Sequence, residues 1–162
     1  MGRTEAVRIR KIPADFDRWA DVLALIMDAF AAMDGVIDPP SSAHLLTPDT
    51  LRDKARREIG FLALEGDRIV GCVFALERVT EFYVGKLAVA PDCQGQGIGR
   101  RLMQAVENLA RSRGKVAIEL QTRIELTANH VAFACLGFCE TERTAHEGYA
   151  RPTSITMRKV IV

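Results

Sequence analysis

LAVAPDCQGQGIG, residues 87–99, reads as a strand, a break and a glycine-rich loop. The first four residues are apolar, and Pro91 ends the strand because proline has no backbone N–H to give to a sheet ladder. The glycines let the backbone turn tightly and bring its N–H groups close to a ligand. An amphipathic helix follows, and its unpaired N-terminal donors add positive potential. Together these features predict a phosphate-binding site.

The spacing of the glycines distinguishes between kinds of phosphate site. A P-loop ends in Gly-Lys-Ser/Thr, whereas Arg100 and Arg101 follow Gly99 here, so the lysine and the magnesium-binding hydroxyl are missing. A dinucleotide-binding fold places G-x-G-x-x-G in its first strand–helix unit, with an acid about 20 residues later. Here the glycines read G-x-G-x-G in the second half of the chain, and Glu119 falls in what reads as the next strand. Both nucleotide interpretations are therefore disfavoured.

A third interpretation fits more of the chain. Gln94-x-x-Gly97-x-Gly99 resembles the Q/R-x-x-G-x-G/A acyl-CoA signature of the GNAT superfamily of N-acetyltransferases. The resemblance continues through Asn129 and the Leu-Gly-Phe sequence at 136–138, and with the strand order it covers roughly residues 7–160. It is specific because a strand, a proline break, a glycine loop, a helix, a second strand and this helix exit agree in order.

Length and composition fit one domain over residues 1–162. The chain is 48% hydrophobic and 27% charged, which is ordinary for a soluble globular protein with a substantial core. A formal net charge of +1 gives no general attraction for nucleic acid or acidic membranes, so neither partner is expected. No run approaches the roughly 20 apolar residues of a membrane helix, and the start lacks a signal-peptide core. We therefore expect a cytoplasmic protein.

The cysteines and histidines predict no metal site. Cys72, Cys93, Cys135 and Cys139 have neither metal-ligand spacing nor the density of a disulfide framework, and no H-E-x-x-H motif occurs. Cys72 and Cys135 lie in apolar runs, where cysteine acts as a small hydrophobic residue. Cys93 borders a helix N-terminus that can lower a thiol pKa, but we expect a spectator rather than a covalent intermediate.

Periodicity and turn signals predict the other elements. The order indicates an α/β fold, in which a mixed, largely antiparallel twisted sheet has helices on both faces, as the resemblance also implies. The first helix is predicted to begin at Pro13, and residues 31–48 are predicted to form a long loop. The expected strands are 7–12, 61–65, 68–77, 81–90, 116–120, 138–143 and 154–160, and the further helices are 48–58, 98–113 and 128–136.

The strand over residues 81–90 shows a slip in its apolar alternation. The apolar positions 82 and 84 share one parity and positions 87 and 89 the other, so the pattern shifts by one residue at Gly85-Lys86. An extra residue there predicts a β-bulge. Strands that bear the acyl group in the GNAT family commonly carry such a bulge, which frees backbone N–H groups from the ladder.

The resemblance implies where acetyl-CoA lies. It would occupy a splayed cleft between strands 81–90 and 116–120, with its pantetheine arm bonded to the first strand. The backbone N–H of Leu87 would donate to the thioester oxygen as charge builds on it. Arg100 is either a diphosphate contact or a solvated side chain. The implied coenzyme-binding residues are Leu87, Ala88, Val89, Gln94, Gly95, Gln96, Gly97, Ile98, Gly99, Arg100, Asn129 and Phe133.

One position departs from the family pattern Asn-x-x-x-Tyr-x-x-Leu-Gly-Phe. Phe133 stands where the family has a tyrosine that often protonates the departing sulfur, and phenylalanine has no proton to give. Cys135 and Tyr149 are substitutes that no spacing selects. Two hypotheses follow: an N-acetyltransferase in which a primary amine attacks acetyl-CoA directly in a ternary complex, or an acyl-CoA-binding regulatory module with little or no catalysis.

Three side chains on the two cleft strands are candidates for the general base. Glu81 and Tyr83 lie on the first strand and Glu119 on the second, although each also fits an exposed or packing role.

The resemblance also implies an acceptor site beside the loop over residues 31–48. Asp34 and Asp38 could attract a cationic amine there, and His146 and Tyr149 either touch the acceptor or lie in a plain surface loop. The acceptor is expected to be a small-molecule or peptide amine. In the family manner, residues 155–157 could pair across a homodimer.

Overall fold

A computed structural model describes residues 6–162 as one seven-stranded sheet with four α-helices. The strands are β1 (Val7–Lys11), β2 (Ile59–Glu65), β3 (Arg68–Glu77), β4 (Glu81–Val89), β5 (Ala117–Arg123), β6 (Cys139–Thr144) and β7 (Ser154–Val160), and the helices are α1 (Trp19–Phe30), α2 (Pro48–Arg57), α3 (Ile98–Ser112) and α4 (Thr127–Cys135).

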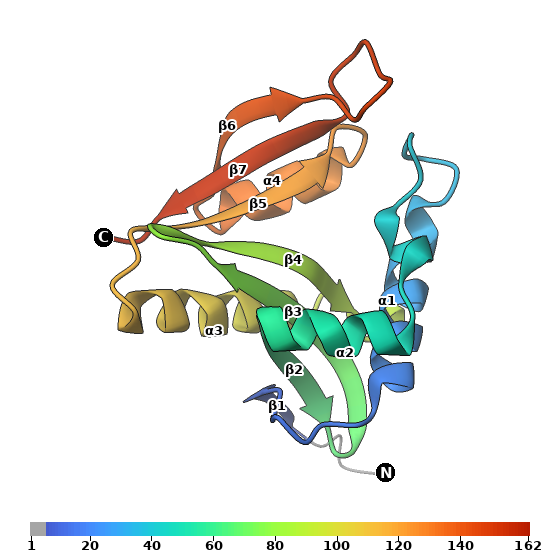
Figure 1. The fold of residues 1–162 in the computed structure, drawn as a ribbon, viewed down its shortest axis with the longest axis vertical. Coiled ribbons are helices and arrows are strands. Elements are labelled where there is room, and N and C mark those ends of the chain that lie inside the picture. Colours follow the sequence, from blue (N-terminus) through green and yellow to red (C-terminus); the bar gives the residue numbers. More distant parts are fainter. Residues whose placement is uncertain (1–5) are drawn as a thin grey trace.

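The sheet is mixed and mostly antiparallel. Its strand order is β1-β2-β3-β4-β5-β7-β6, and within residues 6–162 the one parallel pair is β4 with β5. Figure 1 shows two arms that meet near the C-terminus, with β1 to β4 in one arm and β5, β7 and β6 in the other. The predicted fold class is confirmed.

Side-chain direction along β3 places helices on both faces of the sheet. A side chain at Gly71 would meet Ile98 and Leu102 of α3, whereas Nζ of Lys54 from α2 lies 5.6 Å from the ring centre of Phe74. Positions 71 and 74 have opposite parity, so α3 and α2 cover opposite faces. The helix α4 lies on the α3 side, because residues of both line one small pocket.

The strands β4 and β5 are paired along only part of their length. Residues 81–84 face residues 117–120 in parallel register, and beyond Val84 and Leu120 the strands diverge (Figure 1). The strand β5 continues to Arg123, past its predicted end at Leu120, and forms one wall of the gap. Main-chain groups that face this gap have no strand partner there, and such groups need another partner.

The helices α1 and α2 begin in different ways. The helix α2 begins at Pro48, as predicted, and the hydroxyl of Thr47 caps it by accepting a hydrogen bond from the N–H of Thr50 at 3.1 Å. The predicted start of α1 at Pro13 is wrong, because the helix begins at Trp19. Residues 13–16 form a turn of their own, in which the N–H of Phe16 donates to the carbonyl of Pro13 at 3.2 Å.

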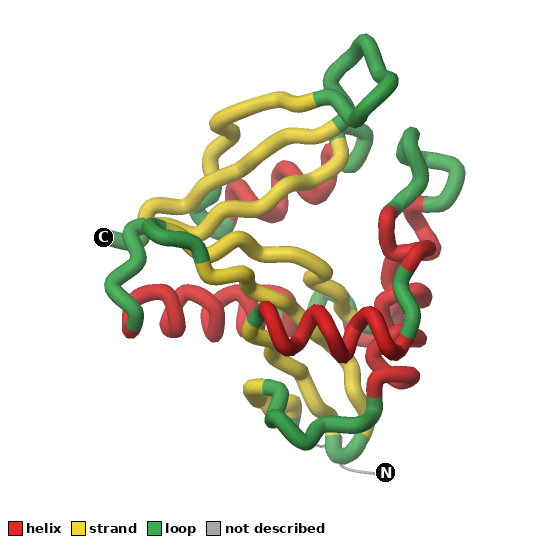
Figure 2. Tube along the Cα trace, in the orientation of Figure 1, coloured by secondary structure: helices red, strands yellow, loops and turns green. Residues whose placement is uncertain are grey.

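The segment between α1 and α2 is a loop, as predicted, but it contains two 3₁₀ turns. These cover Ala31–Met33 and Ser42–Leu45. Figure 2 shows this loop at the open end of the gap, facing the β6–β7 loop of the other arm. The fold thus brings loops from both arms to one place.

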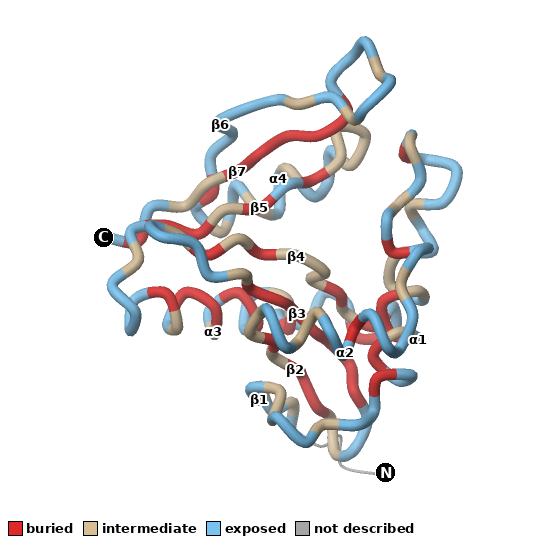
Figure 3. Tube along the Cα trace, in the orientation of Figure 1, coloured by how far each residue is buried: buried red, intermediate tan, exposed pale blue. Residues whose placement is uncertain are grey.

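The last strand, β7, is an inner strand of the sheet. Ile155–Met157 pair with β5 on one side and with β6 on the other. The expectation that residues 155–157 pair across a homodimer is therefore wrong, because both hydrogen-bonding edges are already used. Figure 3 shows β7 largely buried and β6 exposed at the edge of the sheet.

Glu107 makes two ion pairs, one with Lys159 that joins α3 to β7 and one with Arg111 within α3. Its carboxylate accepts from Nζ of Lys159 at 2.9 Å and from the guanidinium of Arg111 at 2.8 Å. Burial acts to raise the pKa of Glu107, but the hydrogen bonds from Lys159 and Arg111 outweigh it and lower the pKa below its ordinary value. The ion pairs stabilise the fold above the pKa that Glu107 has in the unfolded chain. This stabilisation is lost as pH falls through the pKa of Glu107 in the folded protein.

Glu107→Gln should lower the free energy of unfolding by about 1 kcal/mol at neutral pH, since solvent screens part of each ion pair. Chemical denaturation at pH 7 and at about pH 3 checks the sign, because the difference between variant and parent should shrink in acid. Gln104→Glu, an exposed change on the same helix, serves as the comparison. A difference that grows in acid would contradict this account.

Within the described part of the chain, no helix is long and apolar enough to cross a membrane.

Candidate active site

A β-bulge interrupts the pairing of β3 with β4. Gly85 faces Phe74 and Ala88 faces Cys72, so two residues of β4 stand opposite a single residue of β3. One of the two, Lys86, has a φ of 53°, which is uncommon for a residue with a side chain. The bulge predicted from the parity slip is confirmed. It lies just beyond the point where β5 leaves β4, so the N–H of Leu87 sits in an irregular stretch of backbone beside the gap.

The glycine loop runs from the end of β4 to the start of α3. Gly95 and Gly97 have φ values of 77° and 80°, the left-handed region that glycine adopts without strain. Residues 94–97 are exposed, and no side chain caps the N-terminus of α3. The amide of Gln94 donates to the carbonyl of Val89 at 3.1 Å, which ties the loop to the strand. The first N–H groups of α3 are thus open to an anion.

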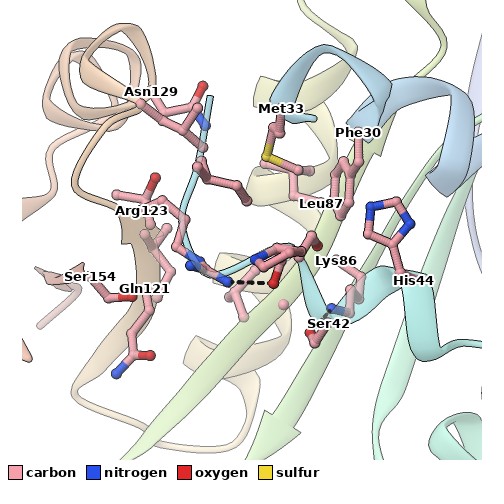
Figure 4. A pocket seen from close by; sticks show the side chains of 18 of the residues that line it. Phe30, Met33, Ser42, His44, Lys86, Leu87, Gln121, Arg123, Asn129 and Ser154 are labelled. Atoms are coloured by element: carbon pink, nitrogen blue, oxygen red, sulfur yellow. Dashed lines mark hydrogen bonds between the residues drawn. The ribbon is translucent and has the colours of Figure 1, made fainter. Parts of the chain in front are cut away.

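A cavity of about 720 Å³ passes through the sheet where β4 and β5 separate. On the α4 side it is lined by Asn129 and Phe133, and on the α1 side by Phe30 and Met33. Figure 4 shows Asn129 at one end, Phe30 and Met33 at the other, and Leu87 of β4 among them. The bulge therefore opens into a space that residues of both sheet faces enclose.

Hydrogen bonds join the loops of the two arms at the open end of the gap. The hydroxyl of Tyr149, in the β6–β7 loop, donates to Asp38 at 2.6 Å, and Arg151 lies 3.4 Å from the same carboxylate. From β5, Arg123 donates to the carbonyls of Pro39 and Pro40 at 2.7 and 3.1 Å. The α1–α2 loop is thus held across the gap.

A comparison with sequence models of known protein families identifies the family of this chain. The model described as the acetyltransferase (GNAT) family matches residues 19–138. The chain belongs to this family. The resemblance stated from the sequence is confirmed, and this GNAT protein is a member of a family of acyltransferases.

Individual relatives agree with the family. The chain is 33% identical over 91 residues to N-alpha-acetyltransferase 30 of Schizosaccharomyces pombe, covering 53% of this chain and 61% of that protein. It is 29% identical over 123 residues to the IAA acetyltransferase of Azospirillum brasilense, covering 74% of this chain and 78% of that protein. The chain thus spans less than two thirds of the first relative.

A solved structure shares the fold. The PaiA N-acetyltransferase of Thermoplasma acidophilum, solved in complex with coenzyme A, superposes with a TM-score of 0.77. The two are 13% identical, and the match covers 96% of this chain and 99% of the other.

The structure brings some of the sequence-predicted coenzyme residues to the cavity. Leu87, Asn129 and Phe133 line it, and Phe133 packs edge-on against Phe138 with ring centres 6.0 Å apart. Ala88 is buried in the ladder with β3, and Val89 is half-buried. The glycine loop, from Gln94 through Gly99, lies at the end of the same strand and outside the cavity, as does Arg100. Arg100 lines a smaller pocket between α3 and α4.

The general-base candidates fall in different places. Tyr83 lines the cavity, and burial raises the pKa of its phenol, with Arg78 opposing the shift, so the hydroxyl is a donor at neutral pH. Glu119 is held 3.7 Å from Arg78 and 3.3 Å from Arg158 and does not line the cavity. Glu81 lies where β4 and β5 are still paired, and its carboxylate accepts a hydrogen bond from Thr80.

Glu81→Gln should therefore leave the turnover number within about twofold of the parent, because no acid–base group of the reaction would be lost. The carboxylate is outside the cavity, and glutamine keeps an acceptor for Thr80. Steady-state kinetics of thiol release from acetyl-CoA measures the effect. A fall of a hundredfold, typical of a lost acid–base group, would return Glu81 to the catalytic candidates.

None of the four cysteines lines the cavity. Cys93 is buried, and burial, followed by the charge of Asp92, raises the pKa of its thiol, so it stays protonated at neutral pH. Cys72 is buried as its apolar run predicts, but Cys135 is exposed, so its predicted role as a small hydrophobic core residue is wrong. Its position near the C-terminus of the short helix α4 explains the exposure.

Sequence reasoning missed the basic side chains of the cavity. Lys54 on α2, Lys86 in the bulge and Arg123 on β5 all line it. The helix 48–58 carries several basic residues, and nothing in its sequence separates the one that faces the gap from those that face solvent. For Lys86 a signal existed, because the parity slip placed it inside the bulge, where its direction departs from the strand alternation.

Proposed function

We propose that the protein is an acetyl-CoA-dependent N-acetyltransferase that moves the acetyl group to a primary amine by direct attack in a ternary complex. One observation carries this: the bulge of β4 opens into a cavity that reaches both faces of the sheet, next to an open glycine loop. The loop would hold the diphosphate, and Leu87 and Val89 would bond the pantetheine arm along the edge that β5 leaves. The amine would then enter from the α1–α2 side.

The proposed reaction needs few side chains. The nitrogen lone pair of a neutral amine attacks the thioester carbon, and charge builds on the carbonyl oxygen, where the N–H of Leu87 donates. The carbon–sulfur bond then breaks, the sulfur leaves with the electron pair, and the nitrogen loses its proton to water. The products are an amide and coenzyme A.

The positive potential of the cavity favours both a neutral amine and the departure of the thiolate. The basic groups that line it disfavour a protonated amine, so they lower the pKa of a bound ammonium and raise the fraction of nucleophile. The same positive potential stabilises the departing thiolate. This stabilisation of the thiolate would compensate for the proton that a tyrosine at the position of Phe133 would supply.

Release of coenzyme A thiol from acetyl-CoA, measured with a panel of primary amines, tests the proposal. The panel holds amino acids, short peptides with free N-termini, polyamines and aminoglycosides, since the names of relatives include both an N-alpha-acetyltransferase and an aminoglycoside acetyltransferase. Amine-dependent release with sequential kinetics is expected. Tight acetyl-CoA binding by calorimetry with no release from any amine would favour the regulatory module instead.

A further inference from the structure

Charge is distributed unevenly around the cavity. Three cationic side chains line it. Lys54 lies on α2, and Lys86 and Arg123 donate hydrogen bonds to the α1–α2 loop. The lining from α4, on the opposite side, is uncharged: it consists of Asn129 and Phe133. No aspartate or glutamate of the described chain lines the cavity. The half proposed for the acceptor is therefore the cationic half.

The carboxylates that contact lining residues, and those of the α1–α2 loop, are paired outside the lining. Glu58 binds Nζ of Lys54 at 2.7 Å, so the charge of Lys54 is largely offset. Asp34 bonds to His44 at 2.8 Å, and Asp38 is held by Tyr149 and Arg151. Asp34 and Asp38 are thus already engaged with neighbouring side chains. This argues against the hypothesis that they attract a cationic amine.

Glu125 is also engaged outside the cavity lining. One of its carboxylate oxygens accepts from the N–H of Asp38 at 2.9 Å, and the other is buried with no hydrogen-bond partner among the residues that the structure describes.

Within residues 6–162, two cationic groups of the cavity have no carboxylate partner. The ammonium of Lys86 donates to the hydroxyl of Ser42 at 2.9 Å, and the guanidinium of Arg123 donates to two backbone carbonyls. These partners are neutral, so they satisfy hydrogen bonds without offsetting charge. Figure 4 shows Lys86 and Arg123 on two walls of the cavity, one from β4 and one from β5.

The half-buried position of Lys86 disfavours its charged form. It lowers the pKa of the ammonium, and the charges of Lys54 and Arg123 act in the same direction, while Glu58 opposes them. An anion beside the ammonium would offset the burial and the repulsion together. The free protein thus holds a half-buried cation that a negatively charged ligand would stabilise.

A simple polycation fits this half poorly. An acceptor with several ammonium groups would meet repulsion from Lys86 and Arg123 that no carboxylate of the lining relieves. An acceptor with a carboxylate near its amine brings its own counter-charge and can give Lys86 a charge-assisted hydrogen bond.

We propose that the acceptor is an amino-carboxylic acid, with its carboxylate bound between Lys86 and Arg123 and its amine directed at the thioester. This rests on the proposed function, because the same cavity serves both. The cationic half then selects the substrate by charge, and Lys86 is the residue that determines specificity.

Binding provides a test that does not require turnover. Saturation-transfer NMR on the protein with coenzyme A compares α-amino acids with their α-carboxamides, which differ in the carboxylate. The acids should bind at least about tenfold more tightly, the range of one charge-assisted hydrogen bond. Equal affinity, or preference for a polyamine, would overturn the proposal.

Variants assign the effect to the residue. Lys86→Gln should reduce the acid-to-amide ratio of kcat/KM about tenfold, and Lys86→Arg should restore most of it. Comparing this ratio between variant and parent cancels the difference between the intrinsic pKa values of the two amines. Arg10→Gln, which removes an exposed positive charge from β1, should leave the ratio unchanged. A ratio that Lys86→Gln does not change would refute the role of Lys86.

The two proposals fail in different ways. If no amine releases thiol but acids still bind better than amides, the catalytic proposal fails and the charge selection stands. If thiol release occurs with amides or polyamines as readily as with amino acids, the enzyme stands and the charge selection fails.

Discussion

Replacing Gly97 with valine should weaken coenzyme A binding about thirtyfold, equivalent to about 2 kcal/mol of backbone strain. Gly97 has a φ of 80° and immediately precedes α3. A β-branched residue leaves this region when it can, and the loop would move its N–H groups away from the cradle. Binding would then have to restore the strained conformation at a cost in free energy. Calorimetric titration with acetyl-CoA measures the change.

Gly114 offers a matched control at the other end of the same helix. Its φ is 68°, and a side chain there would meet no atom within 4 Å, as is true at Gly97. Gly114→Val therefore carries similar backbone strain but lies beyond the C-terminus of α3. Coenzyme affinity should stay at the parent value in this variant. An equal loss in both variants would show that strain in α3, and not the cradle, governs binding.

The second large effect concerns stability. Phe74→Ala should lower the free energy of unfolding by about 3–5 kcal/mol, the usual cost of removing a buried aromatic ring. The ring is fully buried between β3 and α2, and its backbone pairs with Gly85 at the edge of the bulge. The space left by the ring would lie next to β4, the strand whose bulge opens into the cavity. Urea denaturation followed by circular dichroism gives the free energy.

Val79→Ala is the comparison for this change. Val79 is 92% exposed in the turn between β3 and β4, so its truncation should alter stability by no more than about 0.5 kcal/mol. A loss below about 1 kcal/mol for Phe74→Ala would mean that α2 closes onto the sheet and fills the space.

Local sequence patterns predicted the features that depend on a few neighbouring residues. The alternation of apolar side chains in residues 81–90 was enough to place the bulge, because a slip of one residue moves side chains to the other face. The glycines at 95 and 97 predicted a tight turn of the backbone, and both have the positive φ values of such a turn. Pro48 likewise predicted the start of α2, because proline is favoured in the first turn of a helix.

Long-range arrangement explains the rest. The position of β7 between β5 and β6 depends on pairings far apart in sequence, so the last strand looked free to pair with a second copy. Glu81 and Tyr83 are two residues apart on one strand, and only the point where β5 diverges decides that Tyr83 lines the cavity. The basic lining has the same origin, since only the fold brings Lys54 and Arg123 to the same cavity.

The passage through the sheet has a consequence for inhibitor design. A compound that joins the sulfur of coenzyme A covalently to an amino acid would be threaded between β4 and β5, with one end on each face. It could dissociate only by drawing one end through the opening or by parting the loops that Asp38 and Tyr149 tie together. Its residence time should therefore be long for its affinity, with slow onset as well as slow release.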